Sequence, residues 1–195
     1  MMSPNPEPVD DLNNLETSNR RREWRPFMEK YGIQKLAEIG VYEGQNFKRM
    51  IAHNPELAVG VDVWREEGIP GQNDSDKSQE ELDSAYRHLE HKYIGHKNVK
   101  IIRDYTVKAA ELFPDEFFDC IYIDADHTYE GAKADVEAWH PKVKKGGFVI
   151  GDDYWDRYSP KRHVRFGVVK AVNEFADKNG LTVHPLSLHG WIILK

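Results

Sequence analysis

Short apolar runs alternate with longer stretches of helical periodicity along most of the chain. The runs are too short for helices and are rich in Val and Ile, which is typical of buried strands. We therefore predict alternating strands and helices, the pattern of an α/β fold with a parallel sheet. The predicted strands cover residues 35–40, 57–62, 98–103, 117–123 and 145–151, with helices between them over residues 45–52, 78–93, 106–112 and 129–139.

The last part of the chain predicts a different arrangement. A helix is expected over residues 164–178, closed by Asn179 and Gly180 in the manner of a left-handed cap. Apolar runs follow at residues 181–184 and 190–194, separated by too few residues for a parallel crossover. They must pair antiparallel. We expect a mostly parallel sheet that ends in an antiparallel hairpin.

The N-terminal residues lack this alternation. Prolines, Asn and Asp dominate residues 1–12, so we predict that residues 1–14 are a disordered tail. A polar, arginine-rich helix is predicted over residues 15–31, with Trp24 and Phe27 near one face. Residues 15–195 should then form a single domain.

Acidic residues follow the fourth and fifth predicted strands directly. The carboxyl ends of parallel strands meet at the edge of a sheet where ligands bind, and neighbouring strands lie about 4.8 Å apart. We therefore expect the carboxylates to converge on one small volume. They are Asp124 and Asp126 after one strand, and Asp152 and Asp153 after the next.

A glycine turn follows the first strand. A strand, a glycine turn and a helix together aim backbone N–H groups at an anion. The dinucleotide fingerprint needs glycine at the first, third and sixth positions, which here are Gly40, Tyr42 and Gln45, so only the first fits. A Glu38-x-Gly40-x-x-x-Gly44 turn better suits a ligand with a carboxylate and an ammonium group, and Glu38 could meet the ammonium.

Two further strand ends offer contacts for a nucleoside. Asp62 ends the second strand about twenty residues past the glycine turn, where an acid binds the two hydroxyls of a ribose. Asp104 and Tyr105 end the third strand, where a carboxylate can accept a hydrogen bond from an adenine amino group. All three positions fall on the same predicted edge.

Composition narrows the function class. Lys and Arg number 27 against 33 Asp and Glu, a net charge of −6, which argues against a dedicated nucleic-acid binder. The one cysteine, Cys120, lies in an apolar strand, so we predict a core residue, no disulfide and a reducing compartment. No run reaches the length of a membrane span and the N-terminus lacks a signal-peptide core, so we expect a cytoplasmic protein with no membrane partner.

From about residue 33 to 195, these features together resemble class I S-adenosylmethionine-dependent methyltransferases. The resemblance implies a Rossmann-like fold with a mostly parallel, seven-stranded sheet and an antiparallel C-terminal hairpin. The stretch Ile123-Asp124-Ala125-Asp126-His127-x-Tyr129 is similar to the small-molecule O-methyltransferase branch related to the macrocin and caffeoyl-CoA O-methyltransferases. Further matching positions are Asp135, Trp139, Pro141, Lys142, Gly146, Gly147, Gly151, Asp153 and Tyr154.

The resemblance also assigns site residues. It implies cofactor contacts from Glu38, Gly40, Tyr42 and Gly44 at the methionine end, Asp62 at the ribose, Asp104 and Tyr105 at the adenine, and also from Val63 and Asp124. Metal-dependent relatives hold a divalent ion with acids that fall here on Asp124, Asp152 and Asp153. Many sequences of the nearest type have His at the position of Asp152, and the acid present here favours Mg²⁺, Mn²⁺ or Ca²⁺.

We therefore predict methyl transfer from S-adenosylmethionine to a hydroxyl of a small molecule of the sugar or phenolic type. A divalent ion would lower the pKa of that hydroxyl, and Asp126 or His127 would take its proton. Two alternatives stay open, a nicotinamide-dependent Rossmann oxidoreductase and a non-catalytic module that binds S-adenosylmethionine or a nucleotide. The sequence also leaves open N-methylation and a homodimer formed through the N-terminal helix.

Overall fold

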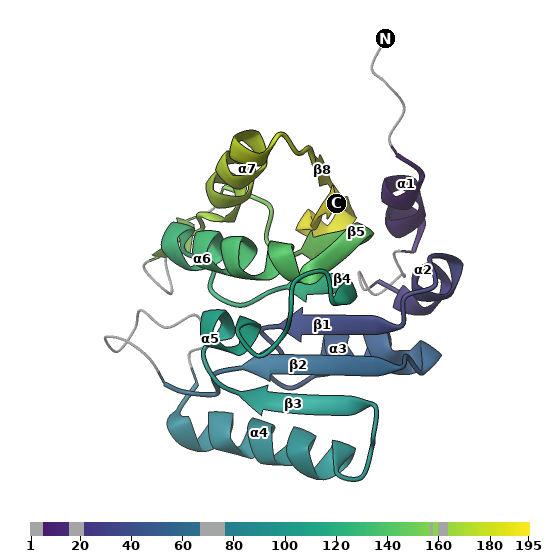
Figure 1. Ribbon diagram of the computed structural model, residues 1–195. Helices are drawn as coiled ribbons and strands as arrows, with labels where there is room; N and C mark the ends of the chain where they lie inside the picture. Colours follow the sequence, from purple (N-terminus) through teal and green to yellow (C-terminus); the bar gives the residue numbers. More distant parts are fainter. Residues whose placement is uncertain (1–5, 16–21, 67–76, 157, 160–163) are drawn as a thin grey trace.

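The computed structural model describes residues 6–15, 22–66, 77–156, 158–159 and 164–195. Their core is a seven-stranded sheet with strand order β3-β2-β1-β4-β5-β9-β8. Figure 1 shows β1, β2 and β3 side by side with their arrowheads at the same end. The strands are β1 (Lys35–Ile39), β2 (Leu57–Asp62), β3 (Val99–Arg103), β4 (Phe118–Ile123), β5 (Val143–Gly151), β8 (Val183–Pro185) and β9 (Trp191–Leu194).

The direction of each strand matches the prediction. The first five strands are mutually parallel, whereas β9 runs antiparallel to both β5 and β8. The Rossmann-like α/β fold with its antiparallel C-terminal strands is therefore confirmed. The strand order reverses between β1 and β4, and in open sheets ligands bind in the crevice at this switch point.

Helices cover both faces of the sheet and enclose two apolar clusters. Side chains of α5, α6 and α7 pack on one face, and those of α1 to α4 pack on the other. The central strand β4 contributes to both clusters because its side chains alternate, with Ile121 on one face and Tyr122 on the other. The helices are α1 (Glu7–Asn14), α2 (Trp24–Lys30), α3 (Gln45–Met50), α4 (Gln79–Tyr93), α5 (Thr106–Ala110), α6 (Tyr129–Trp139) and α7 (Val168–Asn179), with short 3₁₀ turns η1 (Ile51–His53), η2 (His140–Lys142) and η3 (Ser187–His189).

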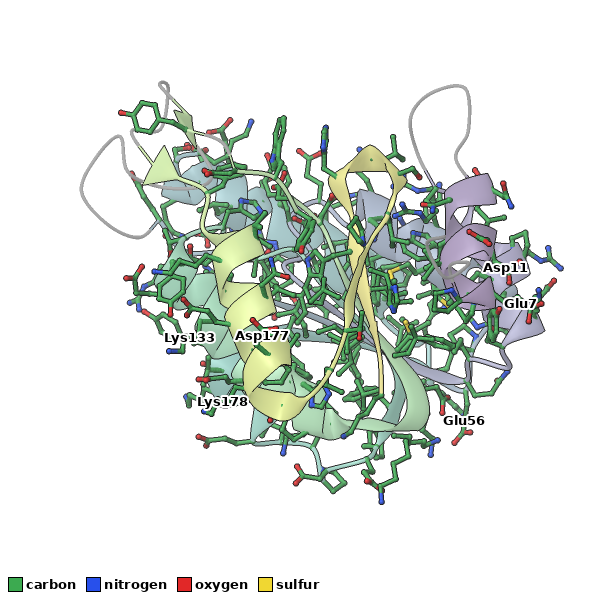
Figure 2. The ribbon with its side chains drawn as sticks, turned by 90° about the horizontal axis from the view of Figure 1, so that it is seen from above. Glu7, Asp11, Glu56, Lys133, Asp177 and Lys178 are labelled. Atoms are coloured by element: carbon green, nitrogen blue, oxygen red, sulfur yellow. The ribbon has the colours of Figure 1, made fainter. Side chains whose placement is uncertain are left out.

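The prediction of a disordered tail is wrong for residues 7–14. They form α1, whose Val9 and Leu12 are buried in the same cluster as α2. The prolines and polar residues suggested disorder, but proline is tolerated in the first turn of a helix. The two apolar residues, three positions apart, were too few to indicate a helix by periodicity. Lys30 of α2 also pairs with Glu7 and Asp11, both labelled in Figure 2, at 2.7 and 2.8 Å. Residues 1–5 lie outside the described part of the chain.

Two other predicted helices have different boundaries. The helix predicted over residues 15–31 begins only at Trp24, and residues 16–21 lie outside the described ranges. The helix predicted from residue 164 begins at Val168, because residues 164–165 form β7 (Val164–Arg165), which pairs with β6 (Tyr158–Ser159). Gly167 precedes α7, and a Cβ there would lie 2.3 Å from the backbone nitrogen of Tyr129. This close approach to Tyr129 explains why the helix begins only after Gly167, a boundary that periodicity does not reveal.

In the part of the chain that the structure describes, every helix is too short or too polar to cross a membrane.

Candidate functional site

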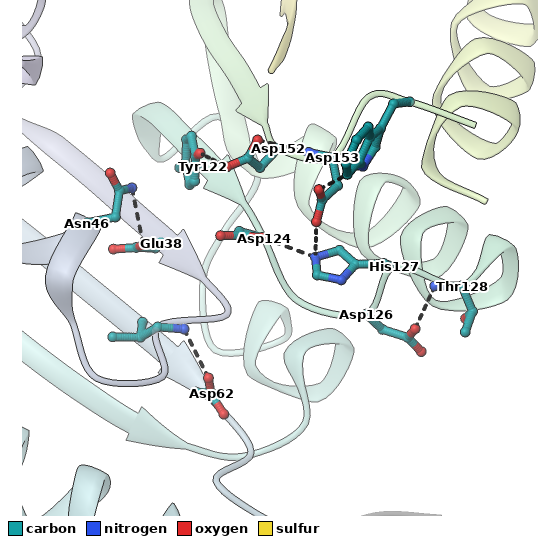
Figure 3. Close-up of polar contacts among 12 residues, drawn as sticks. Glu38, Asn46, Asp62, Tyr122, Asp124, Asp126, His127, Thr128, Asp152 and Asp153 are labelled. Carbon is teal, nitrogen blue, oxygen red and sulfur yellow. Dashed lines mark hydrogen bonds and ion pairs between the residues drawn. The ribbon is translucent and has the colours of Figure 1, made fainter. Parts of the chain in front are cut away.

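The carboxyl ends of β1, β2, β4 and β5 bring the predicted acids to one edge of the sheet. Figure 3 shows Glu38, Asp62, Asp124 and Asp153 around this edge. The edge includes the switch point between β1 and β4, so it is the expected position of a ligand.

Glu38 is a buried acid with one oxygen that has no hydrogen-bond partner among the described residues. Its side chain lies at the end of β1 and the residue is 1% exposed. Oε1 accepts a hydrogen bond from Asn46 Nδ2 at 3.2 Å, whereas Oε2 has no hydrogen-bond partner among the described residues. Burial raises the pKa of Glu38 well above its ordinary value, and the nearby charge of Asp124 raises it further. A cationic group placed beside Oε2 would relieve both effects.

The glycine turn is tightly packed on both sides. Gly40 has φ +89°, and a Cβ there would lie 1.9 Å from the carbonyl oxygen of Asp124. Gly44 has φ +73° and caps α3, and a Cβ there would lie 2.5 Å from Leu89 Cδ2 of α4. Only glycine fits at position 40, where a Cβ would meet backbone, whereas at position 44 the positive φ favours glycine and the Leu89 methyl group would have to move. Tyr42, between them, also has positive φ (+48°).

Asp62 holds this turn in place. Its Oδ2 accepts hydrogen bonds from the backbone N–H groups of Val41 and Tyr42, at 3.0 and 2.8 Å. Its Oδ1 accepts from the backbone N–H of Trp64 at 2.8 Å. Burial raises the pKa of Asp62, and these N–H groups oppose that shift. A carboxylate has about four acceptor positions, so ribose hydroxyls would have to share it with the turn.

The predicted adenine contacts line one cavity. Its volume is about 550 Å³ and it lies between the ends of β2 and β3 and the start of α4. Tyr105 is 48% exposed at its wall, and a salt bridge to Lys108 lowers the pKa of Asp104. The lining residues are Val63, Arg65, Gln79, Asp83, Arg103, Asp104 and Tyr105. The structure thus brings together three of the predicted cofactor contacts, Val63, Asp104 and Tyr105.

A second group of polar side chains joins the ends of β4 and β5. His127 Nε2 lies 3.1 Å from Asp124 Oδ1 and 3.0 Å from Asp153 Oδ2. One ligand atom of each residue lies within 4.8 Å of the others. Asp153 Oδ1 also accepts a hydrogen bond from Trp155 Nε1 at 3.0 Å, which fixes its carboxylate. We call Asp124, His127 and Asp153 the acid–histidine cluster.

Asp152, predicted as a metal ligand, lies outside this cluster. Its Oδ2 accepts a hydrogen bond from the Tyr122 hydroxyl at 3.1 Å, and its Oδ1 accepts from the backbone N–H of Asp153 at 2.9 Å. Burial, followed by the charge of Asp124, raises the pKa of Asp152 to about 6. His127 takes the third position of the cluster instead.

Asp126, predicted as a base, is not brought to the cluster either. Its Oδ1 accepts a hydrogen bond from the backbone N–H of Thr128 at 2.8 Å, just before α6. Figure 3 shows its carboxylate turned toward Thr128 and away from Asp124. The side chain packs on Gly131, where a Cβ would lie 2.1 Å from Asp126 Cγ. Of the two predicted bases, the geometry favours His127.

Sequence analysis missed the residues whose side chains donate hydrogen bonds to the acids of the site, or support those donors. Asn46 and Tyr122 had no predicted role, and Trp24 was predicted only to lie near one face of its helix. Asn46 bonds Glu38, Tyr122 bonds Asp152, and Trp24 contacts both Asn46 and Tyr122. A weak signal existed for Asn46, a polar residue on the first turn of the helix that follows Gly44.

Comparisons with known proteins agree with this geometry. A family model described as a methyltransferase domain matches residues 37–154. The uncharacterized protein R132 of Acanthamoeba polyphaga mimivirus is 29% identical over 144 residues, which cover 70% of this chain and 57% of that protein. The chain therefore spans less than two thirds of the length of this relative.

Two solved structures share the fold. The O-methyltransferase NovP has 16% identity and a TM-score of 0.62 over 96% of this chain and 80% of that one. An O-methyltransferase from Bacillus cereus in complex with SAH has 15% identity and a TM-score of 0.60 over 98% and 92%. At such identities the likeness concerns the fold alone.

Proposed function

The chain belongs to the methyltransferase-domain family, and we propose that it transfers a methyl group from S-adenosylmethionine to a hydroxyl of a small molecule. The observation that carries this proposal is the position of two groups on one sheet edge. Glu38, a buried acid with one unpartnered oxygen, lies near the end of β1 just before the glycine turn. The acid–histidine cluster lies after the next two strands of the sheet, β4 and β5. The family match argues against the nicotinamide-dependent alternative.

Glu38, Asp62 and the cavity suit the three parts of this cofactor. Glu38 Oε2 would accept a hydrogen bond from the ammonium group of the methionine part, which would also stabilise the ionised carboxylate. Asp62 would bind the ribose, since it already lies beside the glycine turn. The cavity lined by Val63 and Tyr105 would receive the adenine. A solved structure of the same fold is a complex with SAH, which supports this class of cofactor.

The acid–histidine cluster would prepare the acceptor. A hydroxyl is a weak nucleophile until it loses its proton, so an O-methyltransferase needs a base or a cation there. In the cluster a single point next to His127 Nε2 faces both Asp124 Oδ1 and Asp153 Oδ2. A proton or a divalent ion would be stabilised at this point, but not both at once.

We propose that the cluster binds a divalent ion. Neighbouring ligands of an octahedral ion with bonds of ~2.1 Å lie about 3.0 Å apart. The separations of 3.1 and 3.0 Å from His127 Nε2 match this value. Two carboxylates and one imidazole form a mixed donor set, which suits Mn²⁺ better than Mg²⁺ or Ca²⁺. Such an ion, when bound, lowers the pKa of an acceptor hydroxyl.

Calorimetric titration of the full chain with S-adenosylhomocysteine tests the cofactor assignment. We expect saturable binding at micromolar concentration, and its absence would contradict the assignment. Incubation with radiolabelled S-adenosylmethionine and a panel of sugars and phenols tests the reaction. If the protein binds the cofactor but labels no hydroxyl compound, the result would favour a non-catalytic module that binds S-adenosylmethionine.

Electron paramagnetic resonance of Mn²⁺ tests the metal proposal separately. Asp124→Asn and Asp153→Asn should each weaken Mn²⁺ binding by at least about tenfold. Asp126→Asn is the matched control, because this carboxylate lies nearby but bonds Thr128. Equal Mn²⁺ affinity in all four proteins, the wild type included, would refute the metal site. It would leave His127 as a base that works without an ion.

A further inference from the structure

Trp24 connects the N-terminal helix α2 to the cofactor side of the site. Its indole Nε1 donates a hydrogen bond to Asn46 Oδ1 at 2.8 Å, and Asn46 Nδ2 donates to Glu38 Oε1 at 3.2 Å. Trp24 and Glu38 are each 1% exposed. Asn46, between them, is partly buried, and the three side chains form a continuous chain of contacts.

The chemistry of Trp24 sets the orientation of the Asn46 amide. An indole N–H can only donate, so the Asn46 atom that faces it must be the oxygen Oδ1. The nitrogen Nδ2 is then the atom that faces Glu38, and it must donate. Arg49 Nη2 donates to the same Oδ1 at 3.2 Å and supports this orientation. With Oε1 of Glu38 occupied in this way, Oε2 is the carboxylate oxygen that has no partner among the described residues.

We propose that Trp24 is a positioning residue for S-adenosylmethionine, acting through Asn46 on Glu38. The inference rests on the proposed function, in which Glu38 Oε2 meets the ammonium group of the cofactor. It adds that affinity for the cofactor depends on a residue from outside the segment 37–154 that the family model matches. The N-terminal helix α2 is then part of the binding site although Trp24 touches no ligand.

Trp24 has a second contact, which allows its hydrogen bond to be removed while its ring packing is kept. Its ring packs edge-on against Tyr122, with ring centroids 5.3 Å apart at 78°, and Tyr122 donates to Asp152 at the other side of the site. Trp24→Phe removes the N–H donor but keeps an aromatic ring against Tyr122. We expect S-adenosylhomocysteine to bind about three- to tenfold more weakly, the usual effect of one lost hydrogen bond. Mn²⁺ affinity should stay unchanged.

A matched control separates positioning from general loosening. Phe27→Leu alters another fully buried aromatic residue of the same helix, one that packs on Tyr31 and Phe148 rather than on the site. It should lower the unfolding temperature without changing either affinity. Should Trp24→Phe weaken both ligands, or Phe27→Leu weaken S-adenosylhomocysteine equally, the effect would be structural and the proposal would be wrong.

A double-mutant cycle tests whether Trp24 acts through Asn46. Asn46→Ala should weaken S-adenosylhomocysteine binding, and adding Trp24→Phe to it should cause no further loss. Additive losses would overturn the proposal. If Trp24→Phe does not fold, Asn46→Asp keeps an acceptor for the indole but replaces the donor to Glu38 with a charged carboxylate oxygen. Unchanged affinity in that variant would overturn the proposal too. A wild type that does not bind S-adenosylhomocysteine would instead refute the proposed function and the inference with it.

Discussion

Replacing Glu38 by glutamine should make the protein more stable and less able to bind its cofactor. Glutamine has the same shape, and its Oε1 can still accept the hydrogen bond from Asn46. It removes the negative charge of a carboxylate that is 1% exposed, and its amide NH2 group takes the place of the oxygen that has no partner among the described residues. The gain therefore comes from removing a buried charge and not from satisfying a hydrogen bond. We expect the free energy of unfolding at neutral pH to rise by about 1–2 kcal/mol, a common gain at a functional site.

The gain should depend on pH in a defined direction. The pKa of Glu38 is raised in the folded protein above its ordinary value of 4.5, so the unfolded chain loses this proton first as pH rises. The wild type therefore loses stability from about pH 4.5 upward, until the raised folded pKa has been passed. Glu38→Gln has no such proton. The two proteins should be equally stable near pH 4 and diverge as pH increases.

The same substitution should weaken cofactor binding. A hydrogen bond to a charged group contributes about 1.5–3 kcal/mol, which corresponds to a loss of about 10- to 150-fold in affinity. Ionisation of Glu38 on binding should also release a proton. Calorimetry of the wild type in buffers of different ionisation enthalpy should detect that proton, and Glu38→Gln should not release it.

Chemical denaturation at several pH values and calorimetry with S-adenosylhomocysteine measure both effects. With about 2–4 °C of shift per kcal/mol for a chain of this size, thermal unfolding is sensitive enough as a second assay. If Glu38→Gln were less stable than the wild type at neutral pH, burial would not be the dominant effect at this site. Unchanged affinity would mean that Glu38 does not meet the ammonium group.

Three further substitutions have expected outcomes. Gly40→Ala should destabilise the protein by more than about 4 kcal/mol, because a Cβ would collide with the Asp124 carbonyl, and a normal unfolding temperature would contradict this. Tyr105→Ala should weaken S-adenosylhomocysteine about tenfold through lost stacking without altering the unfolding temperature, since the residue is 48% exposed. Asp62→Ala should cost about 2–4 kcal/mol of stability in the ligand-free protein, because backbone N–H groups of the glycine turn lose their acceptor. Chemical denaturation would show whether Asp62 supports the turn in this way or only binds the ribose.

Periodicity predicted the sheet because its signal is local and strong. Each central strand is a buried run that a period of two or a continuous apolar stretch identifies, and the short C-terminal connection forces β8 and β9 to pair antiparallel. The tail prediction failed for a related reason. Val9 and Leu12 are only two apolar positions, and their burial depends on α2, which the local pattern does not reveal.

The candidate site was predictable only as far as strand ends define it. Glu38, Asp62 and Asp124 end strands, so topology alone places them on one edge. The hydrogen-bond partners of these side chains could not be predicted from topology. Asp126 and Asp152 also end strands, yet a backbone N–H and a tyrosine hydroxyl draw their carboxylates away from the cluster. The tyrosine is thirty positions away from Asp152, which no spacing encodes, whereas Thr128 is only two positions from Asp126, and this local turn competes with the site for the carboxylate.

The helix α4 contacts both ends of the proposed cofactor site. Gln79 and Asp83 at its start line the cavity, and Leu89, more than two turns later, lies where a side chain on Gly44 would be. Because α4 contacts the site at both ends, its motion should decrease when the cofactor binds. Amide hydrogen exchange along residues 79–93 should therefore slow when S-adenosylhomocysteine binds, even at amides on the solvent side of the helix.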